Sequence, residues 1–353
     1  SRMKKRAGFV KPVLDLSPEM EQKSYRVDAG EFQHGDLRIT NEGVQSGNGD
    51  RTPSTRITYQ DIKLLEKLGA GASGTVHRAT YEGKEIAVKV IDIFVREKRH
   101  QLLKEIRSMS KMNSPFVASL IGAFFRDGAI FICIEYLDSG SLEDILKVST
   151  FPIPAIRVAT RQLIAGLVAM HGLRHMHRDI KPANICLNSK GEVKFTDFGI
   201  AREIKETVGV AKTFVGTCTY MSPERIQGNE YSYNSDIWSL GLTLLQCVVG
   251  RYPYSVNGVY IDLMQQIVQD PAPSFSKSEK DNTAPAGVRK LREDFRDFIT
   301  KSLQKDPNKR FQAKTLQAHP FIKVKDEKMR EGEKKKFASW ISKVKKIKKA
   351  GKK

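Results

Sequence analysis

The stretch that most constrains this chain is residues 177–199, which read HRDIKPANICLNSKGEVKFTDFG. It brings two carboxylates, Asp179 and Asp197, together with the cation Lys181 and the amide Asn184. The Asn-Ser-Lys-Gly sequence in its middle predicts a tight turn that lays the two halves side by side. One carboxylate could take a proton from a hydroxyl group, while the other and the amide oxygen are hard ligands suited to Mg²⁺. The stretch therefore predicts a magnesium-dependent active site written almost contiguously.

Length and composition indicate a globular protein. The chain has 353 residues, of which 40% are hydrophobic, so it can bury the core of one large or two medium domains. We find no apolar run as long as a membrane span and no apolar region behind the basic N-terminus. The four cysteines, Cys133, Cys186, Cys218 and Cys247, are scattered without a CxxC pair, which favours reduced thiols over disulfides or a zinc site. We expect a soluble, cytoplasmic protein.

The net charge of +20 is concentrated near the two ends of the chain. Residues 323–353 contain fourteen Lys or Arg against four Asp or Glu, and the first eleven residues contain five basic residues and no acidic one. A nucleic-acid-binding domain would more often carry such charge on a folded face. The distribution therefore predicts two interaction tails on an enzyme-like body, without a specific nucleic-acid partner.

The first 57 residues have little periodicity and end in GVQSGNGDRTPST, a composition typical of a linker. We expect them to be mostly extended or disordered. A basic cluster at residues 4–6 precedes Leu14 and Leu16, which point the same way in an extended peptide. These leucines could fill neighbouring pockets of a partner while the cations meet an acidic patch; the alternative is a solvated tail.

Beyond residue 57, apolar alternation predicts a mainly antiparallel sheet interrupted by one helix. The expected strands are residues 62–68, 75–80, 86–91, 116–125 and 130–135, and the expected helix is residues 96–112. Between the first two strands, Gly69, Gly71 and Gly74 would let backbone amides approach phosphate oxygens. A dinucleotide-binding fold would need a helix directly after these glycines, whereas the next residues continue as a strand, so a glycine-rich hairpin is favoured.

A lysine interrupts an apolar face of the third strand. Period two places Lys89 on the same side as Ala87 and Ile91, and an unpaired buried ammonium is costly. Glu105, which borders the apolar face of the following helix, is the candidate partner. The alternative is that Glu105 pairs with a basic residue in solvent.

The second half of the chain is helical in pattern. Apolar residues from Ile156 to Met170 recur every three or four positions and predict a long core helix that ends near residue 172, and residues 235–241 open another apolar helix. In the basic tail, Phe337, Trp340, Ile341 and Val344, with Ile347 close by, follow helical spacing. Such a helix could bind calmodulin, an anionic membrane or an acidic protein groove, or act in nuclear import. The plain alternative is that its apolar face packs back on the body of the protein.

Taken together, these motifs resemble the eukaryotic protein kinases over residues 58–322, and more closely the plant-type MAP kinase kinases. Lys181, two residues after Asp179, matches the serine/threonine class, and residues 214–225, FVGTCTYMSPER, look like the family's activation segment. The resemblance implies an α+β bilobal fold, with a small, mainly antiparallel β lobe containing one main helix and a larger helical lobe. Residues 1–57 would be a flexible extension with a MAP kinase docking motif. Residues 323–353, a lysine-rich amphipathic tail, are not part of the family pattern.

The resemblance also assigns roles. Asp179 would accept the proton of the acceptor hydroxyl, Lys181 would stabilise the γ-phosphate, and Asn184 and Asp197 would hold Mg²⁺. Lys89, fixed by Glu105, would hold the α- and β-phosphates of ATP. The rest of the ATP site would comprise Leu68, Gly69, Gly71, Gly74, Val76, Ala87, Glu135, Leu137 and Cys186, with Glu135 and Leu137 acting through their main chain. Cys186 stands where the family usually has Leu, and Glu224 should form a buried pair with Arg310.

Regulation and partners are implied in the same way. The family phosphorylates both Thr and Tyr of a downstream MAP kinase, which would dock on the motif around Leu14 and Leu16. Thr207 and Thr213, separated by five residues, match the plant-type spacing of the sites that an upstream MAP kinase kinase kinase phosphorylates. The alternatives are a serine/threonine kinase with other substrates, a pseudokinase scaffold, or an adaptor in which the tails are primary. A pseudokinase is disfavoured because no catalytic position is substituted.

Overall fold

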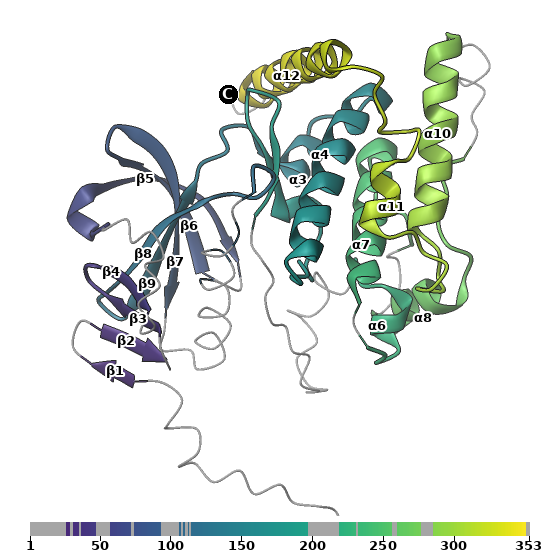
Figure 1. Cartoon of the computed structure of the whole chain (residues 1–353). Coiled ribbons are helices and arrows are strands. Elements are labelled where there is room, and N and C mark those ends of the chain that lie inside the picture. The colour runs from purple at the N-terminus through teal and green to yellow at the C-terminus, as the bar shows by residue number, and fades with distance from the viewer. Residues whose placement is uncertain are drawn as a thin grey trace, which may run out of the picture.

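A computed structural model describes residues 26–28, 31–34, 37–46, 57–71, 74–92, 106, 109, 112, 114–196, 219–230, 232–255, 260–276 and 285–350. These residues form a β-rich lobe from the first part of the chain and a helical lobe from the second (Figure 1). The α+β bilobal architecture is therefore confirmed.

The β-rich lobe is built on a five-stranded antiparallel sheet with the order β5-β6-β7-β9-β8. Its strands are β5 (Ile62–Gly71), β6 (Gly74–Tyr81), β7 (Lys84–Asp92), β8 (Leu120–Arg126) and β9 (Ala129–Glu135). One face has its own small core, in which the rings of Phe124 and Phe131 stack at 4.8 Å between centroids. All five predicted strands are present, although β8 begins at Leu120 rather than Phe116. Val117 instead forms an isolated bridge with Phe195 of the other lobe. Most of the helix predicted at 96–112 lies outside the described residues.

A second, four-stranded antiparallel sheet precedes this one in the chain. It consists of β1 (Arg26–Asp28), β2 (Glu31–His34), β3 (Leu37–Thr40) and β4 (Gly43–Ser46). β3 and β4 lie against β8, and Ile39 is fully buried there (Figure 1). For residues 26–46 this corrects the expectation of an extended or disordered segment. The strands are only three or four residues long, too short for an alternation of apolar and polar residues to be recognised in the sequence.

The helical lobe is organised around two long central helices, α4 and α7. Its helices are α3 (Leu142–Leu146), α4 (Ile153–Gly172), α6 (Pro223–Ile226), α7 (Tyr233–Val249), α8 (Tyr260–Gln269), α10 (Ala286–Ser302), α11 (Ala313–Gln317) and α12 (Glu327–Ala350). The two helices predicted from periodicity correspond to α4 and α7. By length and composition α4 could cross a membrane, but most of it is buried inside the protein, as in the core helix of a globular domain. A small sheet of β10 (Gly140–Ser141), β11 (Ile185–Leu187) and β12 (Val193–Phe195) joins this lobe to the first.

The basic tail forms α12, which lies across α4 at the edge of the helical lobe (Figure 1). Phe337, Ile341 and Val344 are buried, and the ring of Trp340 packs 4.8 Å from that of Phe151. The apolar face of the tail is therefore used to pack on the helical lobe, which was the plain alternative. Ile347 is 57% exposed and so does not belong to this buried face.

A buried ion pair links α6 to the segment before α11. Both side chains are almost inaccessible: the guanidinium of Arg310 donates two hydrogen bonds to Glu224, with Nη1–Oε1 at 2.7 Å and Nη2–Oε2 at 2.9 Å. The hydroxyl of Ser235 donates to the same carboxylate, and Arg310 Nε donates to the carbonyl of Gln304. Every strong donor and acceptor of the pair therefore has a partner, as a buried pair requires. The predicted pairing is confirmed.

We predict that Arg310→Ala lowers the free energy of unfolding by about 3–5 kcal/mol, because it leaves the carboxylate of Glu224 buried without its counter-charge. Denaturant unfolding measures the change. Lys147→Ala is the control, because Lys147 is exposed and pairs loosely with Glu143 at 3.6 Å; its effect should stay below about 0.5 kcal/mol. Equal changes in the free energy of unfolding would contradict the prediction, because the buried pair would then contribute no more to stability than an exposed one.

Candidate active site

The predicted catalytic loop lies between the two lobes and brings three of its polar side chains together. The carboxylate of Asp179 accepts hydrogen bonds at Oδ2 from Lys181 Nζ at 2.8 Å and from Asn184 Nδ2 at 2.7 Å. Asn184 Nδ2 also donates to the main-chain carbonyl of Asp179 at 2.8 Å. These contacts fix the direction of the carboxylate. Because each oxygen has more than one lone pair, Asp179 can still accept the hydrogen bond of an incoming hydroxyl group.

His177 connects this loop to the strand that leads to Asp197. Its ring is fully buried; Nδ1 accepts from the main-chain N–H of Asp179 at 3.4 Å, and Nε2 lies 3.2 Å from the carbonyl oxygen of Thr196. Because Nδ1 accepts, the proton of a neutral ring must be on Nε2, which then donates to Thr196. The main-chain N–H of Thr196 donates in turn to the carbonyl of Asn184. The residue immediately before Asp197 is thus held beside Asn184, while Asp197 itself lies outside the described residues.

Asp236 in α7 holds the catalytic loop through hydrogen bonds to its main chain. It is fully buried, and its two oxygens accept hydrogen bonds from the main-chain N–H groups of His177 and Arg178, both at 2.9 Å, and from His171 Nε2 at 3.0 Å. Burial acts to raise the pKa of Asp236, but the hydrogen bonds and positive charge around it outweigh burial and lower that pKa. Arg178 adopts a left-handed backbone, with φ of 67°, which such anchoring stabilises. No role was predicted for Asp236 from the sequence, although a single carboxylate among the apolar residues of α7 could have pointed to one.

The turn predicted inside the stretch is confirmed. β11 and β12 pair antiparallel, with Ile185 opposite Phe195, so the two halves lie side by side. The side chain of Asn188 holds the turn by accepting from the N–H groups of Lys190 and Glu192. Gly191 has φ of 76°, a conformation that favours glycine. The loop and the strand before Asp197 therefore form one rigid unit.

The glycine-rich segment is a hairpin, as predicted. β5 and β6 pair from Ile62–Tyr81 to Gly71–Gly74, so a strand and not a helix follows the glycines. At Gly74, with φ of 133°, an added Cβ would come within 2.1 Å of the carbonyl oxygen of Val90, which excludes any other residue in this conformation. An added Cβ at Gly69 would meet no atom within 4 Å, so its role is to leave space rather than to relieve a clash.

The walls of the predicted ATP site are present in both lobes. Leu68 of β5 is 44% exposed, Val76 of β6 is half-buried, and Ala87 of β7 is buried. Cys186 of β11 is half-buried, with Sγ 3.8 Å from the hydroxyl oxygen of Thr196, a weak contact that a Leu could not make. The remaining predicted glycine, Gly71, ends β5.

Lys89 lies in the middle of β7, between Val76 of β6 and Ile132 of β9. It is 5% exposed, as expected for a lysine on a strand whose neighbours are buried. Its predicted partner Glu105 lies outside the described residues, so the ion pair between them stays a prediction.

The residues of the predicted adenine contacts lie at the end of β9 and in the segment that follows it. The N–H of Glu135 donates to the carbonyl of Ser119 at 3.0 Å, and the carbonyl of Leu137 accepts from Gly140 at 3.3 Å. The groups that could meet an adenine are therefore the carbonyl of Glu135 and the N–H of Leu137, one acceptor and one donor. The carboxylate oxygens of Glu135 accept hydrogen bonds from Lys194 Nζ at 2.6 Å and 2.8 Å, a link between the lobes that was not predicted from the sequence.

The donor set fits a magnesium ion in part. Within the described residues, both hydrogen bonds of the Asn184 side chain use its nitrogen, so Oδ1 is the atom that can ligate a hard cation. The second predicted ligand, Asp197, follows Thr196 directly and would lie near it. Asn184 and Asp197 would hold Mg²⁺, which would supply neutralisation of phosphate charge.

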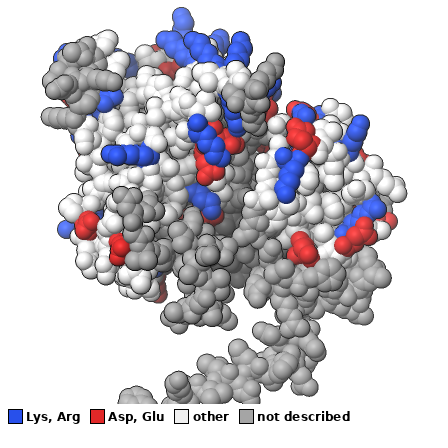
Figure 2. All heavy atoms as spheres, turned by 180° about the vertical axis from the view of Figure 1, so that it is seen from behind, with Lys and Arg blue, Asp and Glu red and all other residues white. Residues whose placement is uncertain are grey.

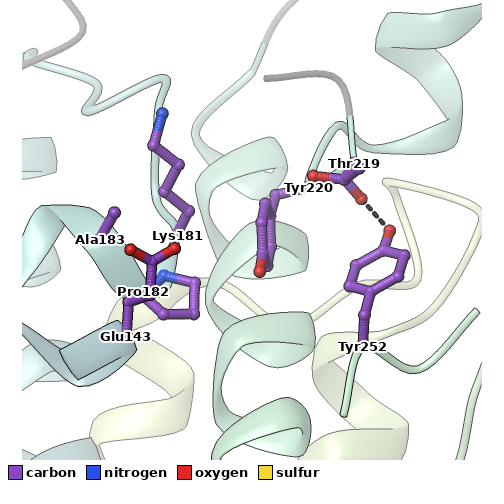
Figure 3. A pocket seen from close by; sticks show the side chains of 7 residues that line it. All are labelled: Glu143, Lys181, Pro182, Ala183, Thr219, Tyr220 and Tyr252. Carbon is purple, nitrogen blue, oxygen red and sulfur yellow. Dashed lines mark hydrogen bonds between the residues drawn. The ribbon is translucent and has the colours of Figure 1, made fainter. Parts of the chain in front are cut away.

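A pocket of about 290 Å³ lies beside the catalytic loop. Lys181, Pro182 and Ala183 form one wall, α3 contributes Glu143, and Tyr220 and Tyr252 stand opposite, as Figure 3 shows. The hydroxyl of Tyr252 donates to the carbonyl of Thr219, which holds that side of the pocket in place (Figure 3). The pocket therefore combines aromatic surface with a carboxylate, directly next to Lys181.

Comparison with known proteins agrees with this geometry. The profile of the protein kinase domain matches residues 62–322. Mitogen-activated protein kinase kinase 3 of Arabidopsis thaliana is 44% identical over 298 residues, which cover 81% of this chain and 55% of that relative. Mitogen-activated protein kinase kinase 2 of the same plant is 35% identical over 344 residues, 91% of this chain and 92% of the relative. Dual specificity mitogen-activated protein kinase kinase 1 of Dictyostelium discoideum is 44% identical over 219 residues, 60% of this chain and 33% of the relative.

The site and the comparisons lead to the same family. The chain has a catalytic loop with a fixed carboxylate, a glycine-rich hairpin and a buried lysine on β7, and the similarity to the second Arabidopsis relative runs through nearly the whole of both chains. The chain belongs to the protein kinases and, within them, to the mitogen-activated protein (MAP) kinase kinases.

Proposed function

We propose that this chain transfers the γ-phosphoryl group of ATP to the Thr and Tyr hydroxyls of a MAP kinase activation loop. The observation that carries the proposal is the fixed carboxylate of Asp179, held by Lys181 and Asn184 on a loop that Asp236 anchors. A kinase needs a carboxylate in this arrangement to orient the hydroxyl, with a cation beside it for the γ-phosphate.

Each residue has a physical task in this reaction. Asp179 accepts the proton of the attacking hydroxyl, and Lys181, 2.8 Å away, stabilises the negative charge that develops on the transferred group. Lys89 of β7 pairs with the α- and β-phosphates of ATP. Asn184 and Asp197 would hold Mg²⁺, which would supply neutralisation of phosphate charge. Because the protein has little covalent work to do, positioning and electrostatics provide most of the rate enhancement.

The pocket beside Lys181 supports a polypeptide acceptor. Its lining includes Lys181 of the catalytic loop, and it offers the rings of Tyr220 and Tyr252 for an extended peptide. The Dictyostelium relative is named a dual specificity kinase, and we propose the same specificity for this chain. It requires a site that admits both a short and a long hydroxyl side chain.

Two further parts of the proposal concern residues outside the described ones. Leu14 and Leu16, behind the basic cluster, would dock the MAP kinase, and Thr207 and Thr213 would be phosphorylated by an upstream MAP kinase kinase kinase. Added phosphate would pair with a cation such as Arg178 and order the segment. Such a cascade would operate in the cytoplasm and, if the lysine-rich tail acts in import, in the nucleus.

The proposed partners of the tail are constrained by its docking. Calmodulin binds basic helices through an apolar face. In α12 that face, with Phe337 and Ile341, is buried against the kinase body. Binding by calmodulin would therefore require α12 to detach first, whereas an anionic membrane or an acidic protein could meet the exposed lysines of the docked helix.

We predict that Asp179→Asn abolishes phosphorylation of an inactive MAP kinase while nucleotide binding persists, because the amide cannot accept the hydroxyl proton. Turnover should fall by at least about a thousandfold, within the range for losing a general base together with its electrostatic contribution. The assay uses a panel of inactive MAP kinases with mass-spectrometric mapping of the phosphorylated residues. Unchanged turnover of the variant would exclude Asp179 as the base. If the wild-type protein bound ATP but transferred no phosphate, the pseudokinase alternative would be favoured.

We also predict that Thr207→Ala/Thr213→Ala gives a folded enzyme with only basal activity after treatment with an upstream kinase, since it cannot gain the ordering phosphates. Activity is compared before and after treatment with that of the wild type, and a thermal melt confirms folding. Full activation of the double variant would refute this regulatory assignment.

A further inference from the structure

Residues 135–138, at the end of β9 and after it, form the hinge between the lobes. The hinge ends in a carboxylate that accepts hydrogen bonds from two other parts of the chain. Asp138 directly follows Leu137, whose N–H faces the proposed adenine site. Its Oδ1 accepts the main-chain N–H of Ser189 at 2.7 Å, from the turn between β11 and β12. Its Oδ2 accepts Nζ of Lys345, from α12, also at 2.7 Å. The two oxygens of Asp138 thus join the β11–β12 hairpin, called the catalytic hairpin below, to α12.

The neighbouring contacts of α12 surround the same end of the site. Lys348 Nζ lies 3.4 Å from the carboxylate of Asp144 in α3, and Lys334 Nζ lies 3.8 Å from that of Glu192, just before β12. A Cβ on Gly191 would approach the main chain of α12 at Lys334 to 3.1 Å, so helix and turn are in close contact. α12 therefore touches the hinge, the helix after it and the catalytic hairpin at once.

The charges of α12 are sorted between two faces. Lys and Arg side chains gather at the top of the molecule in Figure 2, where α12 lies, and Lys343, Lys346 and Lys349 are exposed. Lys345 and Lys348 instead point inward, with side chains 32% and 28% exposed. Burial alone would raise the pKa of Asp138, but the hydrogen bonds from Lys345 and Ser189 lower it below its ordinary value, so the carboxylate stays charged.

We propose that Lys345 is a positioning residue for the nucleotide site. By holding Asp138 it fixes the main chain at Leu137, and so the direction of the N–H that meets adenine. This inference rests on the proposed function, because it assumes that adenine binds at the hinge. The tail would then help to position the ATP site, in addition to any role in binding partners.

The position of the contact decides which kinetic constant it affects. Adenine is far from the transferred phosphoryl group and is bound equally in the ground state and in the transition state. A loosened hinge therefore raises KM for ATP and leaves kcat and KM for the protein substrate nearly unchanged. Because the pair is charged, hydrogen-bonded and only about one-third exposed, we expect an effect of about three- to tenfold.

The test compares three single substitutions in the full chain. Lys345→Gln removes the charge that holds Asp138, Lys346→Gln removes a charge from the exposed neighbour, and Lys345→Arg keeps the cation. We expect KM for ATP to rise about three- to tenfold in Lys345→Gln alone, with kcat retained, and to return close to wild type in Lys345→Arg. A thermal melt shows whether any variant is less well folded.

Adenosine binding, measured by calorimetry without magnesium, separates this inference from the proposed function. Adenosine has no phosphate, so its affinity reports the hinge alone. In Lys345→Gln the affinity for adenosine should fall by about the same factor as KM for ATP rises. Equal constants for Lys345→Gln and Lys346→Gln, or a fall in kcat with KM for ATP unchanged, would overturn the role of Lys345. Failure of the wild type itself to transfer phosphate would instead overturn the proposed function, while the adenosine comparison would still test the contact.

Discussion

The buried carboxylate of Asp236 is the interaction on which the catalytic geometry depends. It offers two oxygens to two consecutive main-chain N–H groups, those of His177 and Arg178, from inside the most apolar helix of the lobe. A charge in such a place is stable only because each of its oxygens is hydrogen-bonded. In return, the loop is held with Arg178 in a left-handed conformation, and Asp179 is presented to the interlobe space. The hydrogen bond from His177 to the carbonyl of Thr196 then links this fixed loop to the strand before Asp197.

The second constraint is the way in which the lobes are tied together. Lys194 of β12 binds Glu135 at the end of β9, and Asp138 binds both the β11–β12 turn and α12. The hinge is thus supported from the catalytic hairpin on one side and from the C-terminal helix on the other. A basic tail with an apolar stripe serves here as a brace of the kinase body, while its outer lysines stay available for an anionic partner.

The sequence predicted the parts that periodicity and spacing encode. The five strands of the main sheet, α4, α7 and the helical tail follow directly from apolar patterns, and the catalytic loop follows from residues that are contiguous in the chain. The missed features depend on contacts between distant residues: Asp236 with His177, Lys194 with Glu135, and Asp138 with Lys345. The small sheet of residues 26–46 was missed because its strands are too short to show a period. Ile347 follows the helical spacing of the apolar stripe, but the packing of α12 leaves it in solvent.

The most direct test of this account is the turnover of Asp236→Asn, measured together with its thermal stability. Asparagine has nearly the same shape but presents an NH₂ group, which must face one of the N–H donors or leave it unpaired. We predict a folded protein whose turnover falls by at least about tenfold, since one lost hydrogen bond to a charged group corresponds to about 1.5–3 kcal/mol. Turnover and stability equal to those of the wild type would contradict the claim that this carboxylate sets the geometry of the active site.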